Sequence, residues 1–264
     1  MKKYFVIGNP IDHSLSPQLH NYWLKKNNIN AIYEKQKLNI NDLQNFVLKI
    51  KNKEISGANI TVPFKKEIIP YLDELSLEAL NTQSVNIIYL SNDKVVGHNT
   101  DINGFELALR DTEFKLSGKK VFILGAGGVV PSIIFALNKM KVSSITLSNR
   151  TKSKAENLKK LFKNILTVDW GEIPDFDIII NATSLGLKSE DNINLDLSKI
   201  EKGKLFYDII YNPNETKFLK YGKMLENKTE NGKKMFLHQA AAAFKIWHGI
   251  QPKISNETIK LLDQ

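Results

Sequence analysis

A short apolar run that stops at a cluster of glycines is the feature that most constrains this chain. Val121–Leu124 has the composition of a buried parallel strand and is followed at once by Gly125–Gly128. Gly125 and Gly127 carry no Cβ, so the backbone can turn tightly and approach a pyrophosphate, whose charge would face the N–H groups that open the next helix. Pro131 suits that opening turn, because the first helical N–H groups need no intrahelical partner. The pattern predicts a strand–turn–helix unit, either as part of a dinucleotide site or as a tight turn without a ligand.

The end of the next strand-like run indicates which dinucleotide would bind. The run at 143–148 ends in Asn149-Arg150-Thr151, whereas a site for NAD carries an acidic residue there for the ribose 2′-hydroxyl. The guanidinium of Arg150 can hold a 2′-phosphate through two parallel hydrogen bonds, and Thr151 and Lys154 can add a hydroxyl and a second charge. A solvated surface arginine is the alternative, although arginine is rare among the 37 basic residues of this chain. We therefore expect NADP as the cofactor.

Composition and charge restrict the class of protein. With 264 residues and 42% hydrophobic content, the chain can bury two moderate cores, so two domains are expected. It has no cysteine, which excludes disulfides and thiolate metal sites and fits a reducing compartment.

The first apolar run is too short for a signal peptide and no run approaches a membrane span, so we expect a cytoplasmic protein without a membrane partner. The net charge of +9 comes mostly from lysines mixed with acidic residues along the chain, which indicates a solvated surface and no nucleic-acid partner.

A second group of polar residues lies in the N-terminal half. Gly57–Val62 alternates as a strand whose Asn59 and Thr61 would share one face. Lys65 follows at the start of a helix, beside the tip of that strand, at the end of the helix dipole that disfavours a cation. Lys66 fits the spacing equally well, and a solvated surface lysine is the alternative for both.

A carboxylate that could pair with such a lysine follows a predicted β-hairpin. The hairpin strands are Ser84–Leu90 and Lys94–Asn99, with Asn92-Asp93 as the turn. Asp101 comes two residues after the second strand. Asn86 is a further polar residue within the apolar first strand.

Two serines flank the start of a helix that follows the first predicted strand, Tyr4–Gly8. Ser16-Pro17 has the pattern of an N-cap followed by proline at the first helical position. The hydroxyls of Ser14 and Ser16 could bind a polyol, or they could make only local turns and caps.

Strands alternate with helices over the second half of the chain. A helical pattern over Ala155–Phe162 is followed by strands at Asp177–Asn181 and Leu205–Tyr211. This order is typical of a parallel doubly wound sheet. Leu237–Trp247 is a strong helix former, and Gly249 ends that helix.

Together these motifs resemble the shikimate dehydrogenase family, and the match runs over nearly the whole chain. The motifs stand in the family's order: Gly8-Asn9-Pro10, His13–Pro17, His20-Asn21, Asn59–Lys65, Asn99–Asp101, Gly125–Gly128, Asn149–Thr151, Asn181–Ser184, Tyr207-Asp208, Gln239-Ala240 and Trp247. The resemblance implies an α/β fold with an N-terminal α/β substrate domain, residues 1–101, to which the last helix returns in 237–264. It implies a doubly wound Rossmann-type NADP domain over 102–236. The implied reaction is the reversible NADPH-dependent reduction of 3-dehydroshikimate to shikimate, in chorismate and aromatic amino-acid biosynthesis, by a chain that can form a homodimer.

The same resemblance assigns roles to individual residues. Lys65 and Asp101 would form the catalytic pair, because an ammonium can stabilise or protonate the oxygen left by hydride transfer and a carboxylate can orient that lysine. The residues assigned to the substrate are Ser14, Ser16, Asn59, Thr61, Asn86, Tyr211 and Gln239. The residues assigned to the cofactor are Gly125, Ala126, Gly127, Gly128, Val129, Asn149, Arg150, Thr151, Lys154, Thr183, Ile209 and Gly232. The reaction requires no metal.

Two alternatives stay open at this point. One is a quinate/shikimate dehydrogenase that uses NAD, against which Arg150 at the strand tip argues. The other is a catalytically silent NADP-binding sensor with the same fold, against which the presence of both Lys65 and Asp101 argues.

Overall fold

The computed structural model describes residues 1–263, which form two compact units. The first unit combines Met1–Gly104 with the residues from Leu237 onward, and the second unit is Phe105–Phe236. The chain passes between the units inside two helices, α5 (Asp101–Arg110) and α9 (Lys233–His248). The domain boundary expected between residues 101 and 102 lies in the first turn of α5. The first unit extends slightly further, to Gly104. In the described part of the chain, no helix combines the length and apolar character needed to cross a membrane.

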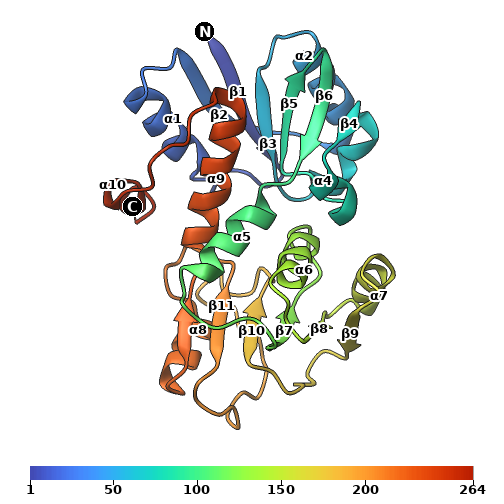
Figure 1. The fold of residues 1–264 in the computed structure, drawn as a ribbon, viewed down its shortest axis with the longest axis vertical. Helices are drawn as coiled ribbons and strands as arrows, with labels where there is room; N and C mark the ends of the chain where they lie inside the picture. Colours follow the sequence, from blue (N-terminus) through green and yellow to red (C-terminus); the bar gives the residue numbers. More distant parts are fainter. Residues whose placement is uncertain (264) are drawn as a thin grey trace. The chain divides into compact units, whose positions relative to one another are not determined.

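The first unit is built on a mixed sheet of six strands in the order β2-β1-β3-β5-β6-β4 (Figure 1). Its strands are β1 (Lys2–Gly8), β2 (Ala31–Lys37), β3 (Gly57–Ile60), β4 (Glu74–Leu75), β5 (Ile87–Ser91) and β6 (Lys94–His98). β1 runs parallel to β2 and β3, and β5 runs antiparallel to β3 and β6. The β5–β6 hairpin turns at Asn92 and Asp93, with φ angles of 49° and 57°, as expected for a two-residue hairpin turn.

Helices cover both faces of this sheet, because apolar side chains along β1 point to both faces. Ile7 lies in a core shared with α2 (Leu43–Lys51), whose buried face consists of Leu43, Phe46, Val47 and Ile50. Tyr4, three residues earlier, packs instead on Trp247 of α9, with the ring centroids 4.9 Å apart. α1 (Ser16–Lys26) joins the same layer through the ring of Trp23, which lies 5.7 Å from that of Phe244.

The remaining helical elements of this unit are short. They are α3 (Phe64–Glu67), α4 (Leu77–Thr82), α10 (Asn256–Lys260) and two 3-10 turns, Ile40–Asp42 and Ile69–Tyr71.

The second unit contains a sheet of six strands, all parallel, in the order β12-β11-β10-β7-β8-β9. Its strands are β7 (Lys120–Leu124), β8 (Ser144–Ser148), β9 (Ile165–Val168), β10 (Ile178–Asn181), β11 (Leu205–Asp208) and β12 (Lys228–Glu230), with helices α6 (Val130–Lys139), α7 (Lys152–Leu161) and α8 (Lys217–Met224). The chain starts at the centre with β7, adds β8 and β9 on one side, and then adds β10, β11 and β12 on the other. The winding reverses between β7 and β10, and a doubly wound sheet binds its ligand at the carboxyl ends of the strands at such a point.

Two strands of this sheet lie outside the predicted pattern. β9 and β12 are the edge strands, and β12 consists of only the three residues Lys228, Thr229 and Glu230. A short, charged strand such as β12 is typical of a sheet edge, where it discourages pairing with another chain. β12 carries no apolar run, so the hydrophobic pattern does not reveal it. β9 is a run of only four apolar and β-branched residues, Ile165–Val168, and was not predicted.

Several local expectations are wrong. Asn86 lies just before β5 and not within it, and β11 ends at Asp208 and not at Tyr211. Ser16 is the first residue of α1 and not its N-cap, which is Leu15 and provides no side-chain bond. Ser14 Oγ instead accepts a hydrogen bond from the Ser16 backbone N–H at 3.3 Å. The strand that carries Asn59 ends at Ile60, so Thr61 belongs to the following loop, and Val62 is 55% exposed.

Candidate active site

A buried ion pair joins Lys65 and Asp101 in the first unit. Lys65 lies on α3 just after β3, and Asp101 is the first residue of α5, so two loop-to-helix junctions bring the pair together. Lys65 is only 8% exposed and Asp101 only 5%. Burying either charge alone would be costly, and the ion pair offsets that cost. The neighbouring Lys66 is exposed, so the structure separates two lysines that the sequence left equivalent.

Two asparagines hold Asp101 in place. Asn86 donates from Nδ2 to Asp101 Oδ1 at 2.9 Å and accepts the Thr100 backbone N–H at 2.7 Å. Asn99 accepts the backbone N–H groups of Asp101 at 3.0 Å and Ile102 at 3.3 Å, which caps the start of α5. The Asn99 Nδ2 group donates in turn to the Ser84 carbonyl at 2.8 Å. The carboxylate that pairs with Lys65 therefore has a fixed position and accepts a hydrogen bond besides the ion pair.

Further polar side chains assigned to the substrate converge in the same unit. Asn86 Nδ2 lies 3.4 Å from Gln239 Oε1 of α9, so α9 contributes to this cluster. Asn59 donates to the Asn86 carbonyl at 3.1 Å. Ser16 is buried, whereas Ser14 and Thr61 are partly exposed.

Tyr33 is a member of this network that the sequence did not single out. Its hydroxyl donates to Asn59 Oδ1 at 2.7 Å and shares a hydrogen bond with the Ser16 side chain. Burial raises the pKa of the Tyr33 hydroxyl well above its usual range, so it stays protonated and able to donate. The only signal for Tyr33 in the sequence is an aromatic residue in a short strand, which is more often simply part of a core.

In the second unit, the glycine turn has the form that a dinucleotide requires. Gly125 has φ +110°, and a Cβ there would lie 2.6 Å from the Ala182 carbonyl oxygen, so only glycine fits. A Cβ on Gly127 would point into open space, with no atom closer than 4.0 Å, and Gly127 and Gly128 are exposed. Val129 is the N-cap of α6, and no side chain caps that helix. The helix start is thus accessible to a phosphate group, which the residues present can hold through their N–H groups.

The cationic group expected for a 2′-phosphate lies at the end of β8. Arg150 and Lys154 are exposed, and the guanidinium of Arg150 makes no hydrogen bond or ion pair with residues 1–263. The Asn149 amide donates to the Thr151 carbonyl at 2.8 Å, which shapes the loop that presents Arg150. A free guanidinium at this position fits a cofactor that carries a 2′-phosphate.

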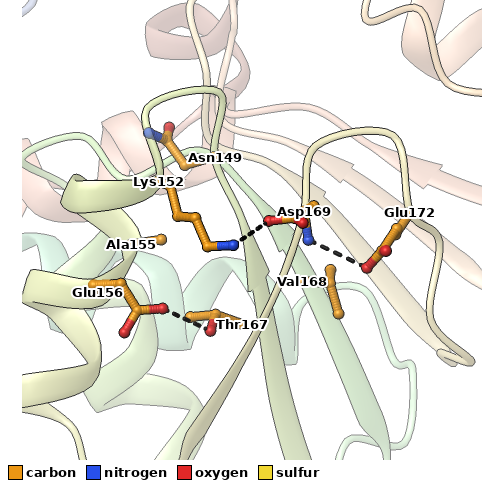
Figure 2. A pocket seen from close by; sticks show the side chains of 8 residues that line it. All are labelled: Asn149, Lys152, Ala155, Glu156, Thr167, Val168, Asp169 and Glu172. Atoms are coloured by element: carbon orange, nitrogen blue, oxygen red, sulfur yellow. Dashed lines mark hydrogen bonds and ion pairs between the residues drawn. The ribbon is translucent and has the colours of Figure 1, made fainter.

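A cavity of about 290 Å³ lies beside this loop, between α7 and the end of β9 (Figure 2). Its polar lining residues bond among themselves: Lys152 Nζ lies 2.8 Å from Asp169 Oδ1, and the Thr167 hydroxyl donates to Glu156 Oε1 at 3.0 Å. Glu172 adds a third carboxylate. An acidic lining disfavours phosphate, so Arg150, which is not among the lining residues, remains the candidate for that group.

Three other residues assigned to the cofactor follow strands of this sheet: Thr183 follows β10, Ile209 follows β11 and Gly232 follows β12. The Thr183 backbone N–H and hydroxyl both donate to Asn181 Oδ1, at 3.1 and 2.7 Å. A Cβ on Gly232 would lie 1.9 Å from the Ile209 carbonyl oxygen, so packing alone requires glycine there. Tyr211, assigned to the substrate, also lies in the second unit, where its ring stacks on Phe236 with a centroid distance of 4.6 Å.

Three family models match the chain in order. The model of the shikimate dehydrogenase substrate binding domain matches residues 6–88. The model of shikimate / quinate 5-dehydrogenase matches residues 106–214, and that of the shikimate 5′-dehydrogenase C-terminal domain matches residues 234–255.

Individual relatives are similar to this chain over nearly its full length. A protein of Pelagibacter ubique named shikimate dehydrogenase (NADP(+)) is 58% identical over 264 residues, which cover 100% of both chains. A crystal structure of a shikimate dehydrogenase in complex with NADP+ is 34% identical, with a TM-score of 0.90 and coverage of 100% of this chain and 93% of that one. The shikimate 5-dehydrogenase of Thermus thermophilus, solved with NADP(H) and shikimate, is 28% identical, with a TM-score of 0.90 and coverage of 99% and 98%. Identity of this extent over both units, together with the three ordered domain matches, means that this chain belongs to the shikimate dehydrogenase family.

Proposed function

We propose that this chain catalyses the reversible NADPH-dependent reduction of 3-dehydroshikimate to shikimate, a step of chorismate and aromatic amino-acid biosynthesis. The observation that carries the proposal is the buried Lys65–Asp101 ion pair, held by Asn86 in the unit that contains the match to the substrate binding domain model. A lysine at the start of a short helix has no structural reason to be buried with a carboxylate, which supports a chemical role for the pair.

The pair suits the chemistry of ketone reduction. NADPH, when bound, supplies the hydride, and negative charge then develops on the substrate oxygen. The ammonium of Lys65 stabilises or protonates that oxygen, and Asp101 keeps the lysine oriented. Asn86 orients Asp101 and lies next to Gln239, which supports both amides as candidates for the hydroxyls of the substrate ring.

Apart from Tyr211, which lies in the second unit, the residues proposed for the substrate lie in the first unit and those proposed for NADP in the second. The residues proposed for the substrate are Ser14, Ser16, Asn59, Thr61, Asn86, Tyr211 and Gln239. The residues proposed for NADP are Gly125 to Val129, Asn149, Arg150, Thr151, Lys154, Thr183, Ile209 and Gly232. The first unit is thus the substrate domain and the second the NADP domain, with the contribution of Gly232 made through packing on Ile209.

The choice of NADP over NAD depends on Arg150. Arg150→Ala should weaken NADP about ten- to a hundredfold, because a charge-assisted bidentate contact contributes roughly 1.5 to 3 kcal/mol. NAD lacks the 2′-phosphate, so its affinity should change little. Titration of both cofactors into the wild type and the variant tests this, and equal weakening of the two would remove the basis for the NADP proposal.

One steady-state assay separates the candidate functions. The wild type is assayed with shikimate or quinate as substrate and with NADP or NAD as cofactor. The match to a model of shikimate / quinate 5-dehydrogenase makes quinate the relevant competitor. We expect turnover to be highest with shikimate and NADP; higher turnover with quinate and NAD would favour the broader dehydrogenase, and no turnover with intact NADP binding would favour a silent sensor.

We further propose that the protein works in the cytoplasm, without a nucleic-acid or membrane partner, and that it can form a homodimer. The absence of a nucleic-acid partner is supported by lysines that are interspersed with acidic residues along the chain. Such a mixture makes a solvated surface and not a single basic stripe.

A further inference from the structure

Asp208, the last residue of β11, is a buried carboxylate that the proposed reaction leaves without a role. It is 0% exposed, and none of the cations within residues 1–263 pairs with it. Three neutral donors bind it instead: Asn181 Nδ2 at 3.1 Å and the Ile210 backbone N–H at 3.0 Å on Oδ1, and the Thr216 hydroxyl at 2.7 Å on Oδ2. A buried carboxylate without a cation is costly, so its acceptor capacity must serve a purpose that an apolar residue cannot.

The contact with Asn181 determines which way that amide points. Asn181 Nδ2 donates to Asp208 and to the Leu185 carbonyl at 3.0 Å, while its Oδ1 accepts both the backbone N–H and the hydroxyl of Thr183. In the flipped orientation, the amide NH₂ would face the Thr183 N–H and the amide oxygen would face a carboxylate. When it is ionised, Asp208 can only accept hydrogen bonds. It therefore selects the orientation of the Asn181 amide that holds Thr183.

The same carboxylate orders the loop that follows β11. Its bond to the Ile210 N–H fixes the chain directly after Ile209, and the Ile209 N–H itself donates to the Asn181 carbonyl at 3.0 Å. The Ile209 carbonyl oxygen is the atom against which Gly232 packs. Asp208 thus links the loops after β10 and β11 through a few short contacts within one unit.

The sheet order assigns these loops to one half of the cofactor. β10 is the neighbour of β7 opposite to β8, and the glycine turn after β7 lies against Ala182 of the loop after β10. Arg150 follows β8, so the adenosine half, with its 2′-phosphate, belongs on that side. A dinucleotide spans the crevice at the point where the winding reverses, and its nicotinamide half then meets the loops after β10 and β11.

We propose that Asp208 is a positioning residue which, through Asn181 and the Ile210 backbone, holds the loops after β10 and β11 in the conformation that receives the nicotinamide half of NADPH. The inference rests on the proposed function, because it requires that the second unit binds this cofactor. Burial raises the pKa of Asp208 to about 6, so above that pH the carboxylate is ionised and can accept all three bonds.

Direct binding measurements at pH 8 test this role without relying on activity. NADPH and 2′,5′-ADP, which represents only the adenosine half with its 2′-phosphate, are titrated into the intact wild type and its variants. Asp208→Ala should weaken NADPH about tenfold or more, because it removes hydrogen bonds to a charged group, and should leave 2′,5′-ADP within about twofold. Asp208→Asn keeps the volume and one acceptor oxygen, and should weaken NADPH about threefold, again without affecting 2′,5′-ADP.

Asp177→Asn is the matched control. Asp177 precedes β10 at the opposite end of that strand and accepts the Lys120 backbone N–H at 2.8 Å, so its loss should affect the affinity of neither ligand. Wild-type NADPH affinity in a folded Asp208 variant, or parallel loss of NADPH and 2′,5′-ADP, would overturn the positioning role. If Asp208→Ala does not fold, the isosteric Asp208→Asn decides. Failure of the wild type to bind NADPH would instead overturn the proposed function itself.

Discussion

At the scale of single residues, Lys65 is the position where the protein should be most sensitive to change. If its ammonium acts on the substrate oxygen mainly in the transition state, Lys65→Ala should lower kcat while altering substrate affinity much less. Loss of a positioned acid–base group costs about two to four orders of magnitude in rate. Steady-state kinetics of shikimate oxidation measures both parameters.

Lys66→Ala is the control for this prediction, because Lys66 is exposed and lies about 100° further around the helix. It should have little effect on kcat. Asp101→Asn should also reduce kcat, and the double variant should be less impaired than the product of the two single effects, because the pair acts as a unit. Mild and equal effects at Lys65 and Lys66, in folded proteins, would leave the lysine without a catalytic role.

At the scale of secondary-structure elements, the start of α5 determines where Asp101 lies. Asn99 caps this helix and also binds the Ser84 carbonyl, so Asn99→Ala should free the first turn to move. We expect a loss of about 0.5 to 2 kcal/mol in stability, as for other N-caps, together with a fall in kcat of about tenfold or more, because Lys65 loses a fixed partner. Urea unfolding and steady-state kinetics measure the two effects.

Ser76→Ala is the comparison for this cap. Ser76 caps α4 in the same unit through a bond from the Ala79 N–H at 3.2 Å, so its loss should cost a similar amount of stability. It should leave kcat nearly unchanged, since α4 carries no residue proposed for the reaction. A fall in kcat of the same size in both variants would mean that the effect of Asn99 is only a general loss of stability.

At the scale of the whole molecule, a buried histidine should make the stability of the first unit depend on pH. His20 is 1% exposed and stacks on Tyr33 at a centroid distance of 4.2 Å. Burial, together with the nearby His248, lowers the pKa of His20 to about 3. In the unfolded chain the pKa is about 6.5, so between these values the unfolded state binds more protons, and stability is lost as the pH falls. From pH 7.5 to pH 5 this loss amounts to about 2 kcal/mol.

His20→Phe should remove this contribution, because it keeps a ring against Tyr33 but cannot bind a proton. It also removes His20 Nδ1, which is buried and has no hydrogen-bond partner among the described residues. The loss of unfolding free energy between pH 7.5 and pH 5, measured by urea titration with tryptophan fluorescence, should be about 2 kcal/mol smaller than in the wild type. His13→Phe, at an exposed position, is the control. An unchanged pH dependence in His20→Phe would show that other groups cause the acid sensitivity.

Local sequence was sufficient to predict the structure at positions where the backbone conformation requires a particular residue type. The left-handed turn at Asn92 and Asp93, the glycine turn at Gly125 and the helix end at Gly249, with φ +70°, were all predictable for that reason. The central parallel strands were equally clear, because strands buried on both faces leave continuous apolar runs. The order of motifs along the chain was enough to predict the family, and hence the arrangement of the sheets.

Which polar residues have partners depends on the tertiary structure. Lys65 and Lys66 are equivalent in sequence, and they differ because the start of α5, which follows β6, places Asp101 against one of them. Asn99 and Tyr33 support the site through neighbours that are 15 and 26 residues away in the chain. The edge strands β9 and β12 likewise exist because β8 and β11 offer them unpaired backbone groups. Periodicity and turn chemistry report what the backbone does locally, whereas pairing depends on distant segments that meet only when the chain has folded.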